Sequence, residues 1–199
     1  MAVMAQGDSW PNKPVKMIVP INAGGGTADP LSRVLSEELG KVLGQRVVIE
    51  NRGGAGGAIG AEMIARAAPD GHTLGMLATS LALNTGLLSK IPYDSVKDFA
   101  PITLAVDTPL IIVVPAALSV KTLPEFIALA KTKPNRIAYG SSGQGTSGHL
   151  ANELLSFRTG ITMLHVPYKG AGPALIDLIG GQVQMVCTST LPSLPHVRS

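Results

Sequence analysis

Cysteine and charged residues are both scarce in this sequence. The 199 residues include one cysteine, Cys187, which cannot form a disulfide within the chain and excludes a cysteine-rich zinc site. Only 15% of the residues are charged, against about 25% in an average globular protein. The 16 Lys and Arg exceed the 13 Asp and Glu by a net charge of +3 and form no basic block. The composition therefore does not indicate a nucleic-acid-binding protein.

Long apolar runs are absent as well. The longest, residues 110–118, contains Pro115 and is far shorter than the ~20 residues of a membrane-spanning helix. The first residues, MAVMAQ, place Val3 and Ala5 where signal peptidase accepts small side chains, but neither a basic nor an apolar region precedes them. Two interpretations stay open: the remainder of an export signal, or an irregular start of a cytosolic protein.

Glycine and proline, by contrast, are abundant. The 23 glycines and 15 prolines lie between apolar segments rather than in a low-complexity tract, which predicts turns and special loops. The apolar pattern up to residue 77 predicts strands at 15–21, 46–50 and 73–77 and helices at 31–43 and 59–68. Asp29 is expected to cap the first helix, with Pro30 at its first position. This alternation predicts a parallel sheet with right-handed crossovers.

The second half of the chain repeats this pattern. Strands are expected at 110–114, 137–139, 163–166 and 183–186, and helices at 123–132, 149–157 and 174–179. Between the halves, residues 90–102 are polar and contain proline, so we expect the chain to pass there from one lobe to the other. The predicted fold class is α/β, with two lobes that each have a mainly parallel sheet flanked by helices.

Two glycine-rich loops, residues 23–29 (AGGGTAD) and 141–149 (SSGQGTSGH), each join a predicted strand to a predicted helix. The first amides of a helix have no acceptor within the helix, and glycine allows a ligand to approach them, so such loops suit an anion. An ordinary tight turn is the alternative, but two such loops with hydroxyl side chains in one chain favour an anion site. A third glycine-rich segment, residues 51–71, favours close packing of a helix on the sheet over ligand contact.

Other kinds of chemistry have less support. Gly143, Gly145 and Gly148 match a dinucleotide-binding fingerprint, but no acidic residue follows around 163–166 to hold a ribose. No Walker A motif and no Gly-x-Ser-x-Gly elbow occurs, and His149 is interpreted as a capping residue. The four histidines are scattered along the chain, so a metal site is not expected.

A set of short motifs runs in order along nearly the whole chain. They are Trp10-Pro11, Lys13-Pro14, Val19-Pro20, the glycine-rich loop ending in Asp29, Glu50-Asn51-Arg52, Gly54-Ala55-Gly56-Gly57, Ala68-Pro69-Asp70-Gly71, Tyr93-Asp94, Lys97-Asp98-Phe99, residues 141–149, His165-Val166-Pro167-Tyr168-Lys169-Gly170 and Gly180-Gly181-Gln182-Val183. No single motif is specific, but the ordered set resembles the periplasmic substrate-binding proteins of tripartite tricarboxylate transporters, the Bug family.

The resemblance implies a periplasmic-binding-protein type II-like fold with two lobes that close like a Venus flytrap. It implies a periplasmic, non-enzymatic protein without a cofactor, which is a monomer when full length. This protein captures a small organic carboxylate and delivers it to membrane permease subunits. Residues 1–12 would be the remainder of the signal and a linker, residues 13–103 the first lobe and residues 104–199 the second. No nucleic-acid partner is implied.

The resemblance also implies a ligand site between the lobes, held by backbone amides and hydroxyls. Carried onto this sequence, the ligand-binding residues are Gly24, Gly25, Gly26, Thr27, Asp29, Thr79, Ser80 and Asn84 on one wall, and Ser141, Ser142, Gly143, Gly145, Thr146, Ser147, His149, Tyr168, Lys169, Gly170 and Thr188 on the other. No catalytic residue and no metal ligand are assigned.

The chain departs from the family pattern in three places. Residues 20–29 form a loop one residue longer than usual, with Asn22 in place of a small or apolar residue. Thr188 and Ser189 stand where many relatives carry Asp-Asn, which favours a ligand with only acidic groups. Relatives are longer, so we expect the first lobe to lack its C-terminal portion and one of two crossings between lobes. An α/β enzyme acting on an acyl or phosphorylated molecule, and a truncated chain unable to bind, remain alternatives.

Overall fold

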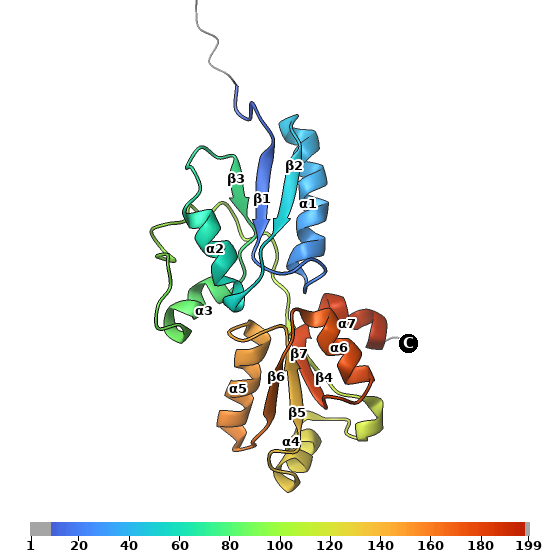
Figure 1. The fold of residues 1–199 in the computed structure, drawn as a ribbon. Coiled ribbons are helices and arrows are strands. Elements are labelled where there is room, and N and C mark those ends of the chain that lie inside the picture. Colours follow the sequence, from blue (N-terminus) through green and yellow to red (C-terminus); the bar gives the residue numbers. More distant parts are fainter. Residues whose placement is uncertain (1–8, 198–199) are drawn as a thin grey trace, which may run out of the picture.

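A computed structural model describes residues 9–197 of the chain. Two β-sheets, each covered by helices, form an N-terminal half and a C-terminal half that are stacked end to end (Figure 1). The expected signal-peptidase positions, Val3 and Ala5, lie outside the described residues. Mainly parallel sheets flanked by helices confirm the expected α/β fold class.

The N-terminal half contains a three-stranded parallel sheet in the order β2-β1-β3. Its elements are β1 (Val15–Val19), α1 (Ala28–Leu43), β2 (Val47–Asn51), the 3₁₀ turn η1 (Ala55–Gly57), α2 (Ala58–Ala65), β3 (Thr73–Gly75) and α3 (Ser80–Leu87). The central strand β1 is almost fully buried apart from Lys16, as expected for an apolar strand with a neighbour on each side.

The C-terminal half contains a four-stranded sheet in the order β4-β7-β5-β6. Its elements are β4 (Leu110–Val113), the 3₁₀ turn η2 (Ala116–Leu118), α4 (Leu123–Thr132), β5 (Ala138–Ser141), α5 (Ser147–Thr159), β6 (Leu164–Pro167), α6 (Ala171–Ile179), β7 (Met185–Ser189) and α7 (Thr190–Val197). Strands β5, β6 and β7 are parallel, whereas β4 pairs with β7 in the antiparallel direction. Phe126, Tyr139 and Met185 fill the core on one side of this sheet.

Three details differ from the sequence-based expectations. Helices α3 and α7 were not expected, and Thr79 and Ser80 therefore lie at a helix start rather than in a plain turn. Helix α1 begins at Ala28 after Thr27, so the expectation that Asp29 is its N-cap is wrong. The Asp29 carboxylate turns back to the amide of Gly24 instead, which fastens the loop that precedes the helix.

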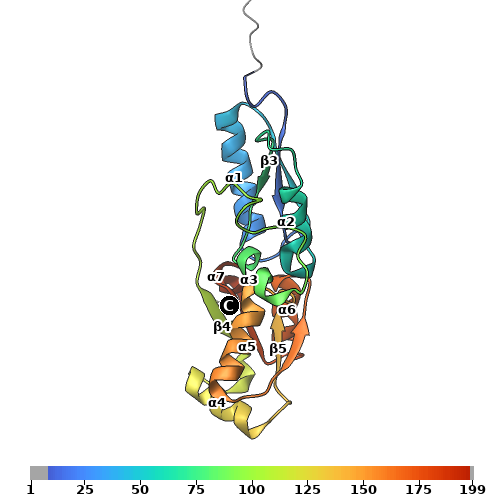
Figure 2. The ribbon, with the colours of Figure 1, turned by 90° about the vertical axis from the view of Figure 1, so that its left-hand side faces the viewer.

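One segment links the two halves within the described residues. Residues 88–109 contain no helix or strand, and Figure 2 shows this segment running down one side of the molecule into β4. Among residues 9–197, no helix combines the length and the apolar character that crossing a bilayer requires.

Glycines allow helices to lie close to the sheets. A Cβ on Gly148 would lie 2.1 Å from the carbonyl oxygen of Cys187, so the third glycine of the fingerprint-like loop sets the contact of α5 with β7. A Cβ on Gly60 would lie 2.7 Å from the carbonyl oxygen of Arg52. Close packing of the helix in the third glycine-rich segment is thereby confirmed.

Candidate functional site

The carboxyl ends of six parallel strands meet at the junction between the halves. In the N-terminal half these strands are β1, β2 and β3, and in the C-terminal half they are β5, β6 and β7. Helices α1, α2, α3, α5, α6 and α7 begin at the same junction (Figure 1). Open α/β sheets bind ligands outside the carboxyl ends of their strands, where helix N-termini favour negative charge.

Five of these helices lack a side-chain cap. The N-cap residues of α1, α2, α3, α5 and α6 make no side-chain capping hydrogen bond; they are Thr27, Gly57, Thr79, Thr146 and Gly170. The first amides of a helix need an acceptor from outside the helix. The junction is therefore lined by helix starts that can receive hydrogen-bond acceptors from a ligand or from water.

The first glycine-rich loop is held by Asp29, which is 3% exposed. Its carboxylate accepts hydrogen bonds from the Gly24 amide at 2.8 Å, from Asn51 Nδ2 at 2.9 Å and from Arg33 at 3.1 Å. Burial, the largest single influence, raises the pKa of Asp29, but these hydrogen bonds together lower the pKa below its usual value. The ionised Asp29 therefore supports the loop, and the Gly24 amide is already occupied.

The second glycine-rich loop is held by its own hydroxyls. Ser141 Oγ donates to the carbonyl of Gly143 at 3.1 Å and accepts from the Gly143 amide at 3.2 Å. Thr146 Oγ1 donates to the same carbonyl at 2.7 Å. The Gly145 amide donates to His149 Nδ1 at 3.3 Å, so this histidine braces the loop just before α5.

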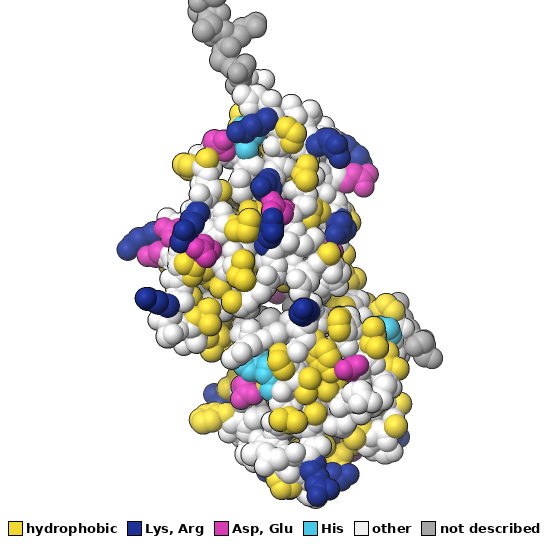
Figure 3. Space-filling model, viewed as in Figure 1, with side chains coloured by type: hydrophobic (Ala, Val, Ile, Leu, Met, Phe, Trp, Pro, Cys, Tyr) yellow, Lys and Arg dark blue, Asp and Glu magenta, His cyan; other side chains and the backbone are white. Residues whose placement is uncertain are grey.

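A stack of three rings lies behind this loop. His165 lies between His149, at a centroid distance of 4.2 Å, and Tyr139, at 4.9 Å. Burial first, and then the neighbouring His149, lowers the pKa of His165. The Tyr139 hydroxyl donates to Glu153, and burial and this carboxylate raise the pKa of Tyr139. Figure 3 shows histidine side chains at the surface of the C-terminal half, close to the narrow waist between the halves.

Ser141 and His165 form a serine–histidine pair, with Oγ and Nε2 2.7 Å apart. Ser141 is 0% exposed, and among residues 9–197 no carboxylate is hydrogen-bonded to His165. A nucleophile must reach its substrate and needs an oriented base. The pair therefore fits a support for the loop. Ser142, the other serine of this loop, makes no hydrogen bond with a histidine within residues 9–197.

A third segment, residues 168–170, completes the C-terminal side. The Tyr168 hydroxyl donates to Asp177 at 2.7 Å, and burial and this carboxylate raise the pKa of Tyr168 to about 12. The Tyr168 hydroxyl is therefore engaged within the C-terminal half. Lys169 is exposed, and its carbonyl accepts from Asn22 Nδ2 at 3.0 Å across the junction.

The loops of the two halves touch. Thr27 Oγ1 donates to Ser189 Oγ at 2.8 Å. A Cβ on Gly170 would lie 3.4 Å from the Cα of Gly25, and a Cβ on Gly56 would lie 2.9 Å from the carbonyl oxygen of Gln144. Glycine at these positions allows backbone to approach backbone across the junction.

The structure brings most of the expected site residues to this junction but gives some of them other partners. The loops at 24–27, 141–147 and 168–170 and the start of α3 lie at it, whereas Thr188 is buried in β7 opposite Ile111. The expected set lacked several residues that contact the opposite half, among them Asn22, Gly56 and Ser189. Asn22 directly follows the strand predicted at 15–21, and Ser189 lies three residues after the one predicted at 183–186. Gly56 belongs to the third glycine-rich segment, whose glycines were its sequence signal.

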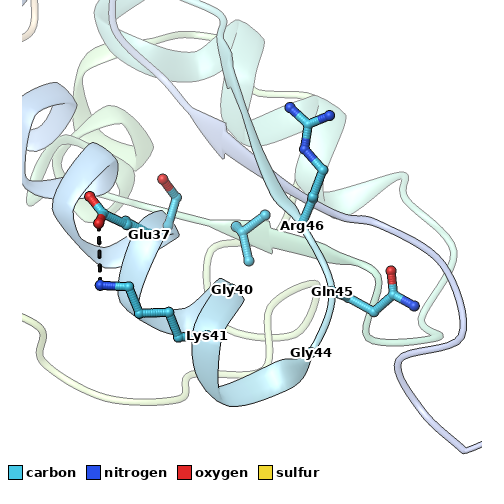
Figure 4. A pocket seen from close by; sticks show the side chains of 8 residues that line it. Glu37, Gly40, Lys41, Gly44, Gln45 and Arg46 are labelled. Carbon is cyan, nitrogen blue, oxygen red and sulfur yellow. Dashed lines mark ion pairs between the residues drawn. The ribbon is translucent and has the colours of Figure 1, made fainter.

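Two surface depressions lie elsewhere. One, about 530 Å³, is lined by Ser36, Glu37, Gly40, Lys41, Gly44, Gln45, Arg46 and Val47 at the C-terminal end of α1. Figure 4 shows it with the ion pair between Glu37 and Lys41. The other, about 500 Å³, is lined by residues that include Lys133, Arg136 and Gln184. Neither contains an expected site residue. In residues 9–197 no group of three or more His, Cys, Asp or Glu is arranged to hold a metal ion.

Two mainly parallel sheets whose strand ends and helix starts face each other define the chain as a two-lobed α/β protein of the periplasmic-binding type. The family described as "Tripartite tricarboxylate transporter family receptor" matches residues 31–199. The chain belongs to this family. Protein BugT of Bordetella pertussis is 39% identical over all of this chain and 61% of its own length. The chain spans 54% to 61% of the length of the first curated relatives that it matches.

Solved structures show the same fold. The R. palustris protein Rpa4515 with adipate has a TM-score of 0.89 at 34% identity, over 95% of this chain and 63% of that one. MatC from Rhodopseudomonas palustris with bound malate has a TM-score of 0.84 at 32% identity, over 95% and 64%. A TctC solute-binding protein from Polaromonas without ligand has a TM-score of only 0.62 at 31% identity, over 96% and 64%.

Proposed function

We propose that this protein is a solute-binding receptor that captures a small carboxylate between its two halves. The observation that carries the proposal is the meeting of five helix starts without side-chain caps at one junction. Malate and adipate, bound in two structures with the same fold, are both small dicarboxylates.

Recognition by amides and hydroxyls explains why the site needs no basic cluster. A hydrogen bond to a charged group contributes about 1.5 to 3 kcal/mol, and micromolar affinity needs about 8 kcal/mol. Four or five such bonds from helix starts, Ser142 and Ser147 supply this after ordering costs. Lys169 adds a positive charge near the junction but does not define it, because its side chain is exposed.

The arrangement of the halves supports a closed state. At nearly equal identity, the TM-score is 0.84 to the malate-bound MatC and 0.62 to the ligand-free Polaromonas protein. A rotation of one half against the other lowers such a score without altering either half. The contacts Thr27–Ser189 and Asn22–Lys169 then belong to the closed state and separate when the site opens.

The family supports the proposed setting. A receptor of a tripartite tricarboxylate transporter works in the periplasm and delivers its ligand to membrane permease subunits as a monomer. The Ser141–His165 pair is buried and serves the loop, so this function requires no chemical step.

Titration calorimetry of the purified chain against mono-, di- and tricarboxylates tests the proposal, with the diamide of succinate as the uncharged control. We expect micromolar binding of at least one dicarboxylate and none of the diamide. Absence of binding across the carboxylate panel, or equal binding of the diamide, would contradict an anion site.

A matched pair of proline substitutions tests the role of the helix starts. Ser147→Pro removes one amide and one hydroxyl at the start of α5, where proline is tolerated, and Thr146 already has the extended backbone (φ −74°, ψ 159°) that proline requires before it. We expect an affinity loss of about tenfold or more. Leu123→Pro makes the same backbone change at α4, away from the junction, and should leave the affinity unchanged.

A further inference from the structure

The end of the C-terminal half that lies away from the junction is built from loops that are distant in sequence. Strands β5, β6 and β7 are parallel and end at the junction, so the loops that precede them lie together at the opposite end, where the antiparallel strand β4 finishes. The Asn135 amide donates to the Thr162 carbonyl at 3.2 Å, which joins two of these loops. We call this surface, made of residues 114–137, 157–163 and 179–184, the distal end.

The distal end gathers positive charge. It contains one acidic residue, Glu125, and the basic residues are Lys121, Lys131, Lys133, Arg136 and Arg158. The net charge of the distal end is therefore +4, whereas that of the whole chain is +3, so the rest of the chain has a slight negative excess. These basic residues form no block in the sequence, and the sheet topology brings them together. Figure 3 shows Lys and Arg side chains at the bottom of the molecule.

The basic side chains of the distal end are free to meet a partner. All five residues are exposed, and none of them takes part in an ion pair within residues 9–197. The far end of the N-terminal half differs, because Lys41 there is paired with Glu37 and Glu38. Like charges without counter-charges raise the local concentration of groups of opposite charge. The distal end is therefore a surface for an anionic partner.

The shape and the apolar side chains of the distal end narrow the kind of partner. Lys133 and Arg136 line a depression of about 500 Å³, together with Thr132. Such a depression admits a phosphate group, which arginine binds through two parallel hydrogen bonds. Around it, Phe157 is 84% exposed and Ile179 is 62% exposed. Exposed apolar and aromatic side chains among basic ones are typical of surfaces that enter the headgroup region of a bilayer.

Phosphate groups beside an apolar layer are what an anionic phospholipid membrane presents. We infer that the distal end docks on the surface of a membrane that contains anionic phospholipids, with a lipid phosphate in the depression. An acidic protein surface matches the charge but not the exposed Phe157 and Ile179. Helix α5 has 13 residues and extends about 20 Å from the junction towards the distal end. The docked protein therefore keeps the carboxylate site clear of the membrane, and docking does not depend on that site.

Co-sedimentation with lipid vesicles tests this inference. Vesicles of equal parts phosphatidylglycerol and phosphatidylcholine are compared with vesicles of phosphatidylcholine alone. We expect the chain to sediment with the mixed vesicles at low salt and to stay in the supernatant with phosphatidylcholine. Salt screens interactions between exposed charges, so binding should be lost as the salt concentration rises.

A matched pair of double variants tests whether the distal end is the surface that binds. Lys133→Gln with Arg136→Gln removes two charges from the depression. A basic residue near an anionic surface contributes about fivefold in affinity, so this variant should bind the mixed vesicles about 25-fold more weakly. Arg46→Gln with Lys90→Gln removes two exposed charges that also lack an ion pair within residues 9–197 but lie outside the distal end. This control should bind like the unmodified chain.

The outcomes separate membrane docking from its alternatives. No binding to the mixed vesicles, or equal binding to phosphatidylcholine alone, overturns the inference. Equal losses in the two double variants also overturn it, because net charge alone then explains the binding. Retention on immobilised polyglutamate without binding to vesicles assigns the distal end to an acidic protein instead. Dicarboxylate affinity should be the same in Lys133→Gln with Arg136→Gln as in the unmodified chain, so failure of this inference leaves the proposed function standing.

Discussion

Helices α4 and α5 both begin after a threonine with an extended backbone, yet only the threonine before α4 caps its helix with its side chain. Thr122, with ψ 156°, accepts a hydrogen bond from the Glu125 amide, and the Glu125 side chain accepts from the Lys121 amide. Thr146, with ψ 159°, directs its hydroxyl to Gly143 instead. The reciprocal cap needs a Glu or Gln three residues after the threonine, and α5 has His149 there.

The difference matches the positions of the two helices. Helix α4 follows the antiparallel strand β4 and lies at the far end of the C-terminal half, away from the proposed carboxylate site (Figure 1). Helix α5 begins at the junction. Helix α4, away from the junction, thus has a side-chain cap, whereas five helix starts at the proposed site have none.

The largest expected effect is the loss of stability on removal of Asp29, which holds the glycine-rich loop before helix α1. Asp29→Ala leaves the Gly24 amide, Asn51 and Arg33 without a buried acceptor and should lower the free energy of unfolding by about 3 kcal/mol, measured by urea denaturation. Glu37→Ala removes an exposed partner of Lys41 with the same four-residue spacing on the same helix and should change stability little. Equal losses in the two variants would contradict the structural role of Asp29.

The next effect concerns closure. Gly56 and Gly44 have positive φ angles of 62° and 66°, so alanine strains the backbone similarly at both. Only at Gly56 would the added Cβ meet the other half, 2.9 Å from the Gln144 carbonyl. Gly56→Ala should weaken dicarboxylate binding by about tenfold, as overpacking at a closed contact does, whereas Gly44→Ala should not alter the affinity. Calorimetry on both variants measures this.

A smaller effect compares the capped and uncapped threonines directly. Thr122→Ala removes the cap of α4 and should lower the free energy of unfolding by about 1 kcal/mol without changing affinity. Thr79→Ala, at the uncapped start of α3, should change stability by less than about 0.5 kcal/mol. Thermal unfolding in the absence of ligand ranks the two, and the reverse order would break the comparison.

The smallest effect is the pH dependence from the ring stack. Burial, followed by the neighbouring His149, lowers the pKa of His165 in the folded chain below its ordinary 6.5, while Glu153 acts in the opposite direction. As the pH falls, the unfolded chain therefore binds this proton at a higher pH than the folded chain does. The contribution of neutral His165 to stability is fully present above about pH 6.5 and decreases as the pH falls below that value. Urea denaturation at several pH values should show that the free energy of unfolding decreases less at acid pH in His165→Gln than in the unmodified chain. An unchanged pH profile would count against this assignment.

Much of the fold could be predicted from the sequence because its signals are local. Apolar runs predicted β1, and three- and four-residue spacing predicted α1; both elements are present with shifted ends. Helices α3 and α7 were not predicted, because α3 has no clear apolar face and α7 contains Pro195. The N-cap of α1 was misassigned because a carboxylate before a helix can bond either forward into the helix or back into its loop.

The sequence by itself determined the α/β alternation, the two glycine-rich loops and the absence of a basic block along the chain, because each depends on residues close together in the chain. Only the tertiary structure decided that Asp29 supports the loop, that Gly56 meets Gln144, and that Asn84 buries an unpaired oxygen. These facts depend on backbone groups that are distant in sequence, and side-chain type does not reveal which of them become neighbours when two sheets meet end to end.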